Sequence, residues 1–216
     1  MPAPATAKIC GLSTPEAVKA ALDGGATHVG FVFFPASPRN LDPETAARLA
    51  APARGRVRVC AVTVDPTDAE LDVIAKVLAP DLIQVHGRED PGRVRAIAGR
   101  TGVGVIKALP VSEASDLDAA QAFDGVADHL MFDARPPRDA TRPGGVGASF
   151  DWALLTGRRF SRPWFLAGGL DPWNVGEAVT QSGAPIVDVS SGVERGPGLK
   201  DPALISAFLE AVKRIR

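Results

Sequence analysis

Eight short apolar segments rich in β-branched residues recur along this 216-residue chain, and they constrain its fold more than any other feature. Several are apolar throughout, which is typical of parallel strands buried on both faces. Helical patterns separate them, so the sequence predicts the α/β class: a single-domain (βα)8 TIM barrel with a parallel eight-stranded sheet, or alternatively a doubly wound sheet. The expected strands cover residues 8–10, 28–33, 57–64, 82–86, 104–109, 129–133, 164–168 and 186–190.

The predicted helices share a start signal in which a capping residue precedes a proline. The capping oxygen accepts hydrogen bonds from backbone N–H groups that have no partner within the helix, and proline suits the first helical position. Asp65-Pro66 carries a similar signal, although Thr67 with Glu70 makes an equally good capping box there. Segments 112–123 and 150–155 are expected to be weak helices. The start signal occurs at Thr14-Pro15, Asp42-Pro43, Asp90-Pro91, Asp171-Pro172 and Asp201-Pro202.

The composition is that of an ordinary globular protein, with 45% hydrophobic and 23% charged residues. A formal net charge of -1 gives no electrostatic reason to expect nucleic acid as a partner. Two cysteines without disulfide-like spacing favour a reducing, cytoplasmic location, and no apolar run reaches membrane-spanning length. Residues 1–7 are expected to form a flexible tail before one domain over residues 8–216, in a monomer or a homodimer.

Two residues at predicted strand ends have the chemistry that acid–base catalysis needs. Cys10 ends the first strand, and the carboxyl ends of barrel strands form the active-site face. Free cysteines are usually small core residues, as expected for Cys60, so spacing alone leaves Cys10 open between core and function. Lys8 faces the same way as Cys10 and is expected either to favour its thiolate or only to pair with Asp188. Asp133 ends the sixth strand, where it caps a loop or, with a raised pKa, donates a proton.

Other polar residues at the same edge are candidate ligands. Arg39 lies in a loop stiffened by two prolines, which favours aiming its guanidinium at a carboxylate, although such a charge is often only solvated. Gln84 and His86 share one strand face and either bind substrate or pair with each other. Lys107 is expected to pair with Asp188 in the barrel neck rather than form a Schiff base. No cluster has metal-ligand spacing, and no cofactor is expected.

Two glycine-rich turns follow the seventh and eighth predicted strands. They contain Gly168-Gly169 and Ser190-Ser191-Gly192. Glycines let a backbone approach a ligand closely, and serine hydroxyls with backbone N–H groups suit a phosphate. Barrels frequently bind phosphate at this place, so a phosphosugar is the expected small-molecule partner. Gly145 and Gly147, with Val146 between them, lie in the long loop 135–149 and are expected to add backbone donors.

Seven stretches in chain order, read together, resemble the phosphoribosylanthranilate isomerase family of tryptophan biosynthesis. The resemblance implies an Amadori rearrangement of N-(5-phosphoribosyl)anthranilate to 1-(2-carboxyphenylamino)-1-deoxyribulose 5-phosphate, without metal or organic cofactor. The stretches are KICGL (8–12), GFVFFPASPRNL (30–41), IQVHG (83–87), MFDA (131–134), PGGVGASFDW (143–152), LAGGLDPWNV (166–175) and VDVSSGVE (187–194).

The resemblance also implies residue roles. Cys10 is similar to the general base that removes the ribose C2 proton, and Asp133 to the general acid that protonates the furanose oxygen. Arg39 is similar to the arginine that holds the anthranilate carboxylate. The two glycine turns are similar to the phosphate cradle. Val146 departs from the family pattern, in which a small polar residue is more common.

Two other functions compete with this interpretation. The first is another phosphosugar barrel enzyme, such as an indole-glycerol-phosphate synthase, which needs a lysine–glutamate pair in the mouth, or an epimerase, which commonly needs a metal. The second is a binding module without catalysis, which would tolerate loss of Cys10 and Asp133.

Overall fold

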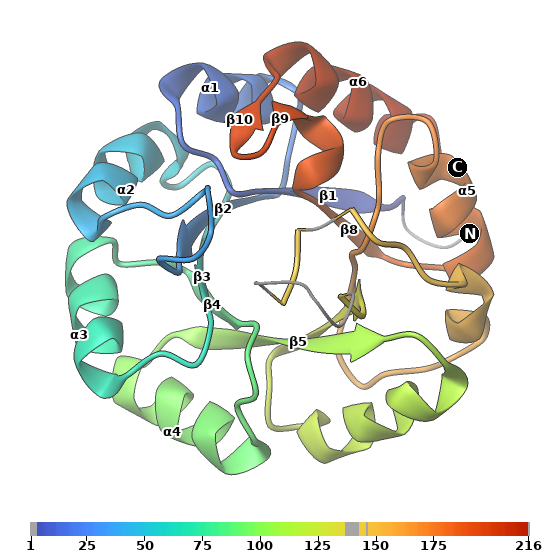
Figure 1. Ribbon diagram of the computed structural model, residues 1–216, viewed down its shortest axis with the longest axis horizontal. Coiled ribbons are helices and arrows are strands. Elements are labelled where there is room, and N and C mark those ends of the chain that lie inside the picture. Colours follow the sequence, from blue (N-terminus) through green and yellow to red (C-terminus); the bar gives the residue numbers. More distant parts are fainter. Residues whose placement is uncertain (1–3, 137–142, 146, 216) are drawn as a thin grey trace.

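The chain forms a closed barrel of eight parallel strands surrounded by helices, and this confirms the predicted (βα)8 barrel over the doubly wound alternative (Figure 1). The computed structural model describes residues 4–136, 143–145 and 147–215. The strands follow one another round the barrel in chain order, and the last one, β8 (Ile186–Val189), pairs with the first, β1 (Thr6–Cys10). Residues from the two ends of the chain therefore become neighbours.

Each remaining strand lies close to its expected position. The other barrel strands are β2 (His28–Phe33), β3 (Arg58–Thr63), β4 (Leu82–Val85), β5 (Gly104–Val111), β6 (His129–Ala134) and β7 (Phe165–Leu166). The α-helices are α1 (Pro15–Asp23), α2 (Pro43–Ala50), α3 (Asp68–Val77), α4 (Pro91–Thr101), α5 (Val175–Ser182) and α6 (Pro202–Lys213). The 3-10 helices are η1 (Ala51–Ala53), η2 (Ala114–Phe123), η3 (Trp152–Leu155) and η4 (Ser191–Val193).

Strand β1 begins at Thr6, two residues before its expected start. The backbone N–H of Thr6 donates to the carbonyl of Pro185 at 3.0 Å, and the N–H of Thr27 donates to the carbonyl of Ala7 at 2.9 Å. Thr6 and Ala7 therefore belong to the barrel sheet, although they were expected in the tail.

The capping signals position four of the five expected helix starts correctly. Helices α1, α2, α4 and α6 each begin at the proline, with the preceding side chain accepting backbone N–H bonds. The prediction at Asp171-Pro172 is wrong: the Asp171 carboxylate accepts from Trp173 and Asn174 N–H groups in a turn, and α5 begins at Val175. The weak helices expected after β5 and β6 are the 3-10 helices η2 and η3.

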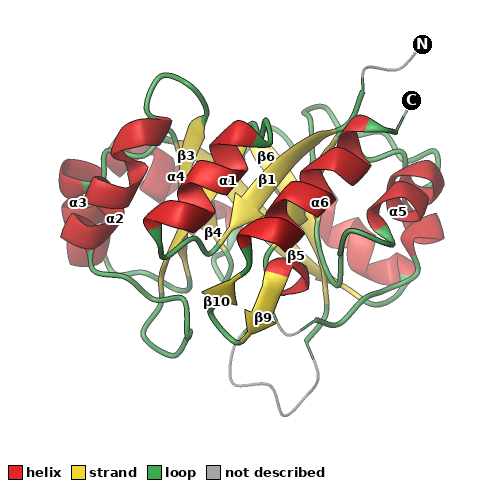
Figure 2. Ribbon diagram, turned by 90° about the horizontal axis from the view of Figure 1, so that it is seen from above, coloured by secondary structure: helices red, strands yellow, loops and turns green. Residues whose placement is uncertain are grey.

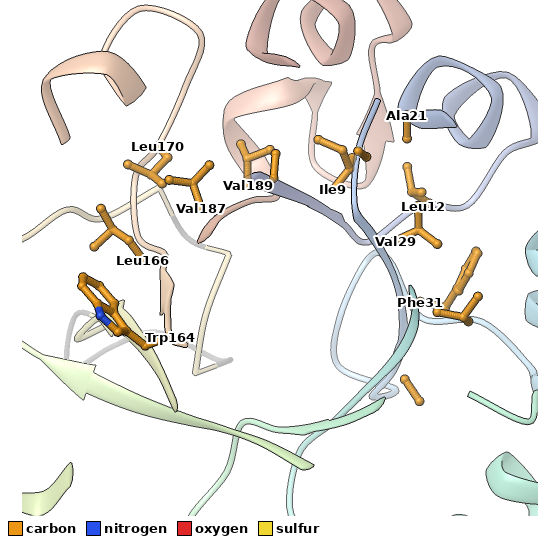
Figure 3. Close-up of a cluster of buried hydrophobic side chains, with 14 of the residues drawn as sticks. Ile9, Leu12, Ala21, Val29, Phe31, Trp164, Leu166, Leu170, Val187 and Val189 are labelled. Atoms are coloured by element: carbon orange, nitrogen blue, oxygen red, sulfur yellow. The ribbon is translucent and has the colours of Figure 1, made fainter. Parts of the chain in front are cut away.

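Strand alternation divides the core into two parts. Side chains on one face of the strands, such as Ile9, Val29, Phe31, Val187 and Val189, lie between the sheet and the helices (Figure 3). The opposite face fills the barrel interior, because successive strand residues point to opposite sides. This inner cluster consists of Cys60, Leu82, Ile106, Ala108, Met131, Phe165, Ala167 and Ile186.

A small hairpin follows η4 and precedes α6. Its strands β9 (Glu194–Gly196) and β10 (Leu199–Lys200) pair antiparallel outside the barrel sheet. Figure 2 shows the hairpin on one face of the barrel, away from the chain termini on the opposite face. The carboxyl end of β8 leads into η4 and then into this hairpin, so the hairpin stands beside the face where barrel active sites lie.

The capping box at the start of α3 gives a stability prediction. The hydroxyl of Thr67 accepts from the Glu70 N–H at 3.3 Å, and the Thr67 N–H donates to the Glu70 carboxylate at 2.7 Å. We expect Thr67→Ala to lower the free energy of unfolding by about 1 kcal/mol, because a backbone N–H loses its acceptor. Urea denaturation measures this change. Lys76→Ala, an exposed change in the same helix, is the control and should leave stability almost unchanged.

Candidate active site

A cavity opens at the carboxyl ends of the strands and encloses about 790 Å³, including its opening to solvent. A space of this size is typical of small-molecule sites. The predicted site residues lie around it, except Gly192. Those that line the cavity are Cys10, Arg39, Gln84, His86, Asp133, Gly145, Gly147, Gly168, Gly169, Ser190 and Ser191. Val146 lies outside the described residues, so the departure predicted there stays a prediction.

Cys10 is 5% exposed and points into the barrel, beside Val32 and Val62. Its partner across the sheet is Gly30, where an added Cβ would lie 3.1 Å from the thiol sulfur. The glycine therefore leaves room for the thiol at the mouth. Cys10 lines the cavity, while Cys60 belongs to the closed inner cluster, and this difference favours a functional role for Cys10.

Lys8 lies one layer below Cys10 and is completely buried. Its ammonium donates to the Asp188 carboxylate at 2.7 Å, and the register of β1 with β8 places the two residues opposite each other. Burial alone would lower the pKa of Lys8, but the Asp188 charge and the thiols raise it above the usual value. The lysine therefore stays charged beneath the thiol.

Lys8 acts on Cys10 in the expected direction, since its charge lowers the pKa of the thiol, but other surroundings outweigh it. Burial raises the pKa of Cys10 above its usual value, and this effect exceeds the opposing effect of the Lys8 charge. The Asp188 carboxylate adds to the increase. Cys10 is therefore a neutral thiol at pH 7 in the unliganded protein, and a strong base whenever it loses its proton.

The predicted pairing of Lys107 with Asp188 is wrong, because Lys107 faces away from the barrel interior. Its neighbours Ile106 and Ala108 belong to the inner cluster, so alternation turns Lys107 outwards. There its ammonium donates to Glu89 at 2.7 Å, with side-chain exposures of 3% and 2%. Among the described residues, neither partner lines the cavity. Lys107 and Glu89 therefore do not supply the described part of the mouth with the lysine–glutamate acid–base pair that a synthase mechanism requires.

Asp133, His86 and Gln84 form a hydrogen-bonded row across the mouth. Nε2 of His86 lies 3.1 Å from the Asp133 carboxylate, and Nδ1 of His86 lies 3.1 Å from Nε2 of Gln84. If Gln84 donates to Nδ1, the ring proton sits on Nε2 and points at Asp133. Gln84 Oε1 is buried and accepts no hydrogen bond from the described residues. The row holds the Asp133 carboxyl in one orientation. It also leaves Gln84 Oε1 able to accept a hydrogen bond from a ligand.

Arg39 is buried at 4% exposure, although it comes from the loop after β2. Its guanidinium forms a two-point ion pair with Glu194, from Nε at 2.6 Å and from Nη2 at 2.8 Å. Nη2 also donates to the carbonyl of Gly145 at 3.3 Å. An added Cβ on Gly11 would lie 2.5 Å from the Arg39 Cδ, so Gly11 is needed for the arginine to cross the first strand's end.

The two glycine turns are packed against each other. A Cβ on Gly192 would lie 1.9 Å from the carbonyl oxygen of Leu170, so Gly192 supports the turn after β7 and does not line the cavity. Gly168 has a φ of 89°, and a Cβ there would lie 2.5 Å from the Ala134 backbone nitrogen. Ser190 and Ser191 face the cavity from the β8 side. Glycine is required in both turns by close backbone approach.

Sequence reasoning missed two groups at this site. The first is an apolar wall of the cavity formed by Val32, Phe34, Val62 and Val64. Alternation along β2 and β3 predicts these inward positions, but apolar residues there look like ordinary core. The second is the pair Glu194 and Lys200, whose side chains are 4% and 0% exposed. Glu194 ends the quoted stretch 187–194, but no sequence signal marks its bond to Arg39, because a bridge between a hairpin and a distant loop has no fixed spacing.

Comparison with known proteins decides the family. The model of the family described as N-(5'-phosphoribosyl)anthranilate (PRA) isomerase matches residues 7–211. The chain belongs to this family. The N-(5'-phosphoribosyl)anthranilate isomerase of Caulobacter vibrioides is 71% identical over 211 residues, covering 97% of this chain and 96% of that protein. The one from Mesorhizobium japonicum is 51% identical over 209 residues, covering 97% of this chain and 95% of that protein.

Solved structures of the isomerase family have the same fold. The phosphoribosyl anthranilate isomerase of Thermotoga maritima is 34% identical, with a TM-score of 0.86 and coverage of 97% of this chain and 98% of that one. A second isomerase structure, in complex with reduced 1-(o-carboxyphenylamino)-1-deoxyribulose 5-phosphate, is 33% identical with a TM-score of 0.83 over the same shares. The family resemblance inferred from the seven sequence stretches is confirmed.

The surroundings of Cys10 predict a thiol that titrates above its usual range. In a Cys60→Ala background, we expect the rate of Cys10 alkylation by iodoacetamide to rise with pH and reach half its maximum above about 8.5, the ordinary cysteine pKa. Lys8→Met should move this midpoint to still higher pH, because the thiolate loses a neighbouring positive charge. The exposed change Lys19→Met is the matched control and should leave the midpoint in place. A midpoint below 8 would contradict the assignment.

Proposed function

We propose that this protein is an enzyme that isomerises N-(5-phosphoribosyl)anthranilate to 1-(2-carboxyphenylamino)-1-deoxyribulose 5-phosphate, the Amadori step of tryptophan biosynthesis. Family membership and relatives of that name over nearly the whole chain support the reaction. The observation that carries the proposal at the level of residues is the shared cavity. A thiol, a carboxyl, a guanidinium and two glycine turns open into it from different strands.

The reaction needs an acid and a base at neighbouring atoms of the sugar. Asp133 is the proposed acid: it gives a proton to the furanose ring oxygen, the C1–O bond breaks, and the anthranilate nitrogen lone pair forms a C=N bond. Cys10 is the proposed base: the fraction of the protein in which the thiol has released its proton to solvent reacts, the thiolate takes the C2 proton, and the electron pair moves towards nitrogen to give an enolamine. Tautomerisation of the enol at C2 then yields the ketone.

The row from Gln84 through His86 to Asp133 supports the role of the acid. His86 Nε2 lies 3.1 Å from Asp133 Oδ2, so a ring proton on Nε2 orients the carboxyl and leaves Asp133 Oδ1 to carry the proton that the acid donates. Gly144 packs against this pair, since a Cβ there would lie 2.8 Å from Asp133 Oδ2 and 2.9 Å from His86 Nε2. The pair of side chains is therefore sheltered from bulk water on that side. We propose that Gln84 and His86 also hydrogen-bond the substrate.

The phosphate end and the carboxylate end of the substrate each have suitable binding groups in the cavity. We propose that the phosphate binds at Gly168, Gly169, Ser190 and Ser191, and the carboxylate at Arg39, with further backbone contacts from Gly145 and Gly147. The wall of Val32, Phe34, Val62 and Val64 suits the aromatic ring between these charges. Fixing both ends orients C1 and C2 between acid and base, which lowers the barrier by several kcal/mol.

The location, cofactor requirement and partners that we propose for this enzyme rest on the sequence. We propose a cytoplasmic enzyme that needs no metal or organic cofactor, since acid and base act through protons alone, and that has no nucleic-acid partner. Monomer or homodimer stays a prediction, as does a flexible tail before Thr6. In the described part of the chain, no helix is long and apolar enough to cross a membrane.

Removing either proposed catalytic group should nearly abolish turnover. We expect Cys10→Ala and Asp133→Asn each to lower kcat by about 10²- to 10⁴-fold, because positioned proton transfer contributes that much. Loss of substrate fluorescence measures the rate. Cys60→Ala, which removes the thiol that does not line the cavity, is the control and should keep most of the activity.

Binding measured beside turnover separates the isomerase from a non-catalytic binding module. The inactive variants should still bind reduced 1-(o-carboxyphenylamino)-1-deoxyribulose 5-phosphate, because the groups at both substrate ends are intact. Near-wild-type turnover by both variants would refute the roles of Cys10 and Asp133. Binding of the analogue by a wild-type protein with no turnover would favour the binding module.

The phosphate turn gives a further test. Gly168→Ala places a Cβ 2.5 Å from the Ala134 nitrogen in a backbone conformation with a φ of 89°. We expect KM to rise by about tenfold or more, since the turn must shift by more than its phosphate bonds tolerate. Competition by inorganic phosphate against the substrate measures the effect directly. Gly157→Ala, with a φ of 71° and open space at its Cβ, is the matched control and should leave KM unchanged.

A further inference from the structure

A buried ion network lies behind the proposed carboxylate-binding arginine. Glu194 stands between Arg39 and Lys200, and the three side chains are 4%, 4% and 0% exposed. Oε1 of Glu194 accepts from Arg39 Nε at 2.6 Å and from Lys200 Nζ at 2.7 Å. Oε2 accepts from Arg39 Nη2 at 2.8 Å and from the Gly198 N–H at 3.1 Å. Both carboxylate oxygens are therefore fully engaged as acceptors.

The charges of this network do not cancel. Arg39 and Lys200 share one carboxylate, so the cluster carries one net positive charge beside the cavity whenever Lys200 is protonated. Burial would raise the pKa of Glu194, but the bonds from Arg39 and the charge of Lys200 lower it below its usual value. Burial lowers the pKa of Lys200, and Glu194 opposes that decrease. A carboxylate arriving from the cavity would neutralise the remaining positive charge.

The geometry also restricts how Arg39 points. The pair with Glu194 uses Nε and Nη2, so the guanidinium plane is fixed by the hairpin and not by its own loop. Gly145 lies against the third nitrogen: a Cβ there would be 2.7 Å from Nη1. Gly11 leaves room for the arginine stem, with a Cβ position 2.5 Å from Cδ. The turn of the hairpin touches the arginine's loop, where a Cβ on Gly198 would meet the Pro38 carbonyl oxygen at 2.6 Å.

We propose that Glu194 is a positioning residue that gives the site its preference for a carboxylated substrate. It holds Arg39 buried and oriented, while Lys200 keeps the cluster positively charged. This inference rests on the proposed function, in which Arg39 binds the carboxylate. Without Glu194, a long side chain with many rotamers would have to be ordered by the ligand itself, at a cost in affinity.

Lys200 connects the ion network around Arg39 to the turn at Ser190, where the phosphate is proposed to bind. Its ammonium also donates to the carbonyl of Ser190 at 2.8 Å and to the Ser190 hydroxyl at 3.2 Å. The same buried cation thus supports the turn proposed for the phosphate and the glutamate that holds the arginine. The β9–β10 hairpin fixes the spacing between the two anion-binding ends of the cavity.

The test compares two ligands that differ only in the carboxyl group. These are reduced 1-(o-carboxyphenylamino)-1-deoxyribulose 5-phosphate and its counterpart without the carboxylate. We expect the wild-type protein to bind the carboxylated form about 10- to 100-fold more tightly, as charge-assisted hydrogen bonds of this kind provide. Glu194→Gln should reduce this ratio to within about threefold. In the reaction, KM should rise while kcat changes much less, because the residue acts on binding.

Two further variants separate positioning from general damage. Glu89→Gln breaks the other buried lysine–glutamate pair, with Lys107, outside the cavity, so it should lower stability and leave the binding ratio unchanged. Glu194→Asp keeps all charges but withdraws the carboxylate by one methylene. It should give a ratio between those of the wild type and Glu194→Gln, and it tests the proposal if Glu194→Gln does not fold.

The outcomes distinguish this inference from the function on which it rests. A wild-type protein that neither binds the carboxylated analogue nor turns over would overturn the proposed function and this inference together. A discriminating wild type with folded Glu194→Gln or Glu194→Asp variants that keep the full ratio would overturn the role of Glu194 alone. An equal loss of the ratio in Glu89→Gln would also overturn it, since any buried ion pair would then suffice.

Discussion

The alternation of side chains along eight parallel strands is the constraint on which the rest of this structure depends. On β1, it sends Ile9 outwards into the helix layer and brings Lys8 and Cys10 inwards, one above the other. On β5, the same rule turns Lys107 outwards to Glu89. A shift of one residue in any strand would exchange its core face for its barrel face. The chemistry of the mouth is therefore set by the register that closes the sheet.

Buried charges in this barrel are held in pairs or in larger groups, and each group secures a different part. Lys8 with Asp188 joins the first strand to the last, while Lys107 with Glu89 joins the fifth strand to the loop after the fourth. The third group, around Glu194, secures the hairpin against the mouth. Burying an ion is costly, and a pair that loses one partner leaves the other uncompensated. These groups therefore specify one arrangement of the loops more than they add stability.

The sequence predicts the barrel and most of the mouth because those features depend on local patterns. Apolar runs give the strands, capping residues give the helix starts, and position at a strand end brings Cys10 and Asp133 to the cavity. The predictions that fail, or that the sequence could not make, concern the face to which a side chain points and contacts between residues far apart in the chain. The partner of Lys107 depends on the face its strand turns inwards, and the bond from Arg39 to Glu194 spans 155 positions in the chain. The acidity of Cys10 depends on how deeply packing buries it, which no motif encodes.

The burial of Cys10 has a consequence for the resistance of this enzyme to oxidation. Peroxides attack the thiolate, so a cysteine that is low in pKa and open to solvent is the one converted to a sulfenic acid. Cys10 is neutral at pH 7 and 5% exposed, between the side chains of Val32 and Val62. The general base of the proposed reaction is thus stored in a form that oxidants reach slowly. A carboxylate base would avoid oxidation altogether, but the thiol combines an uncharged resting state with strong basicity after ionisation.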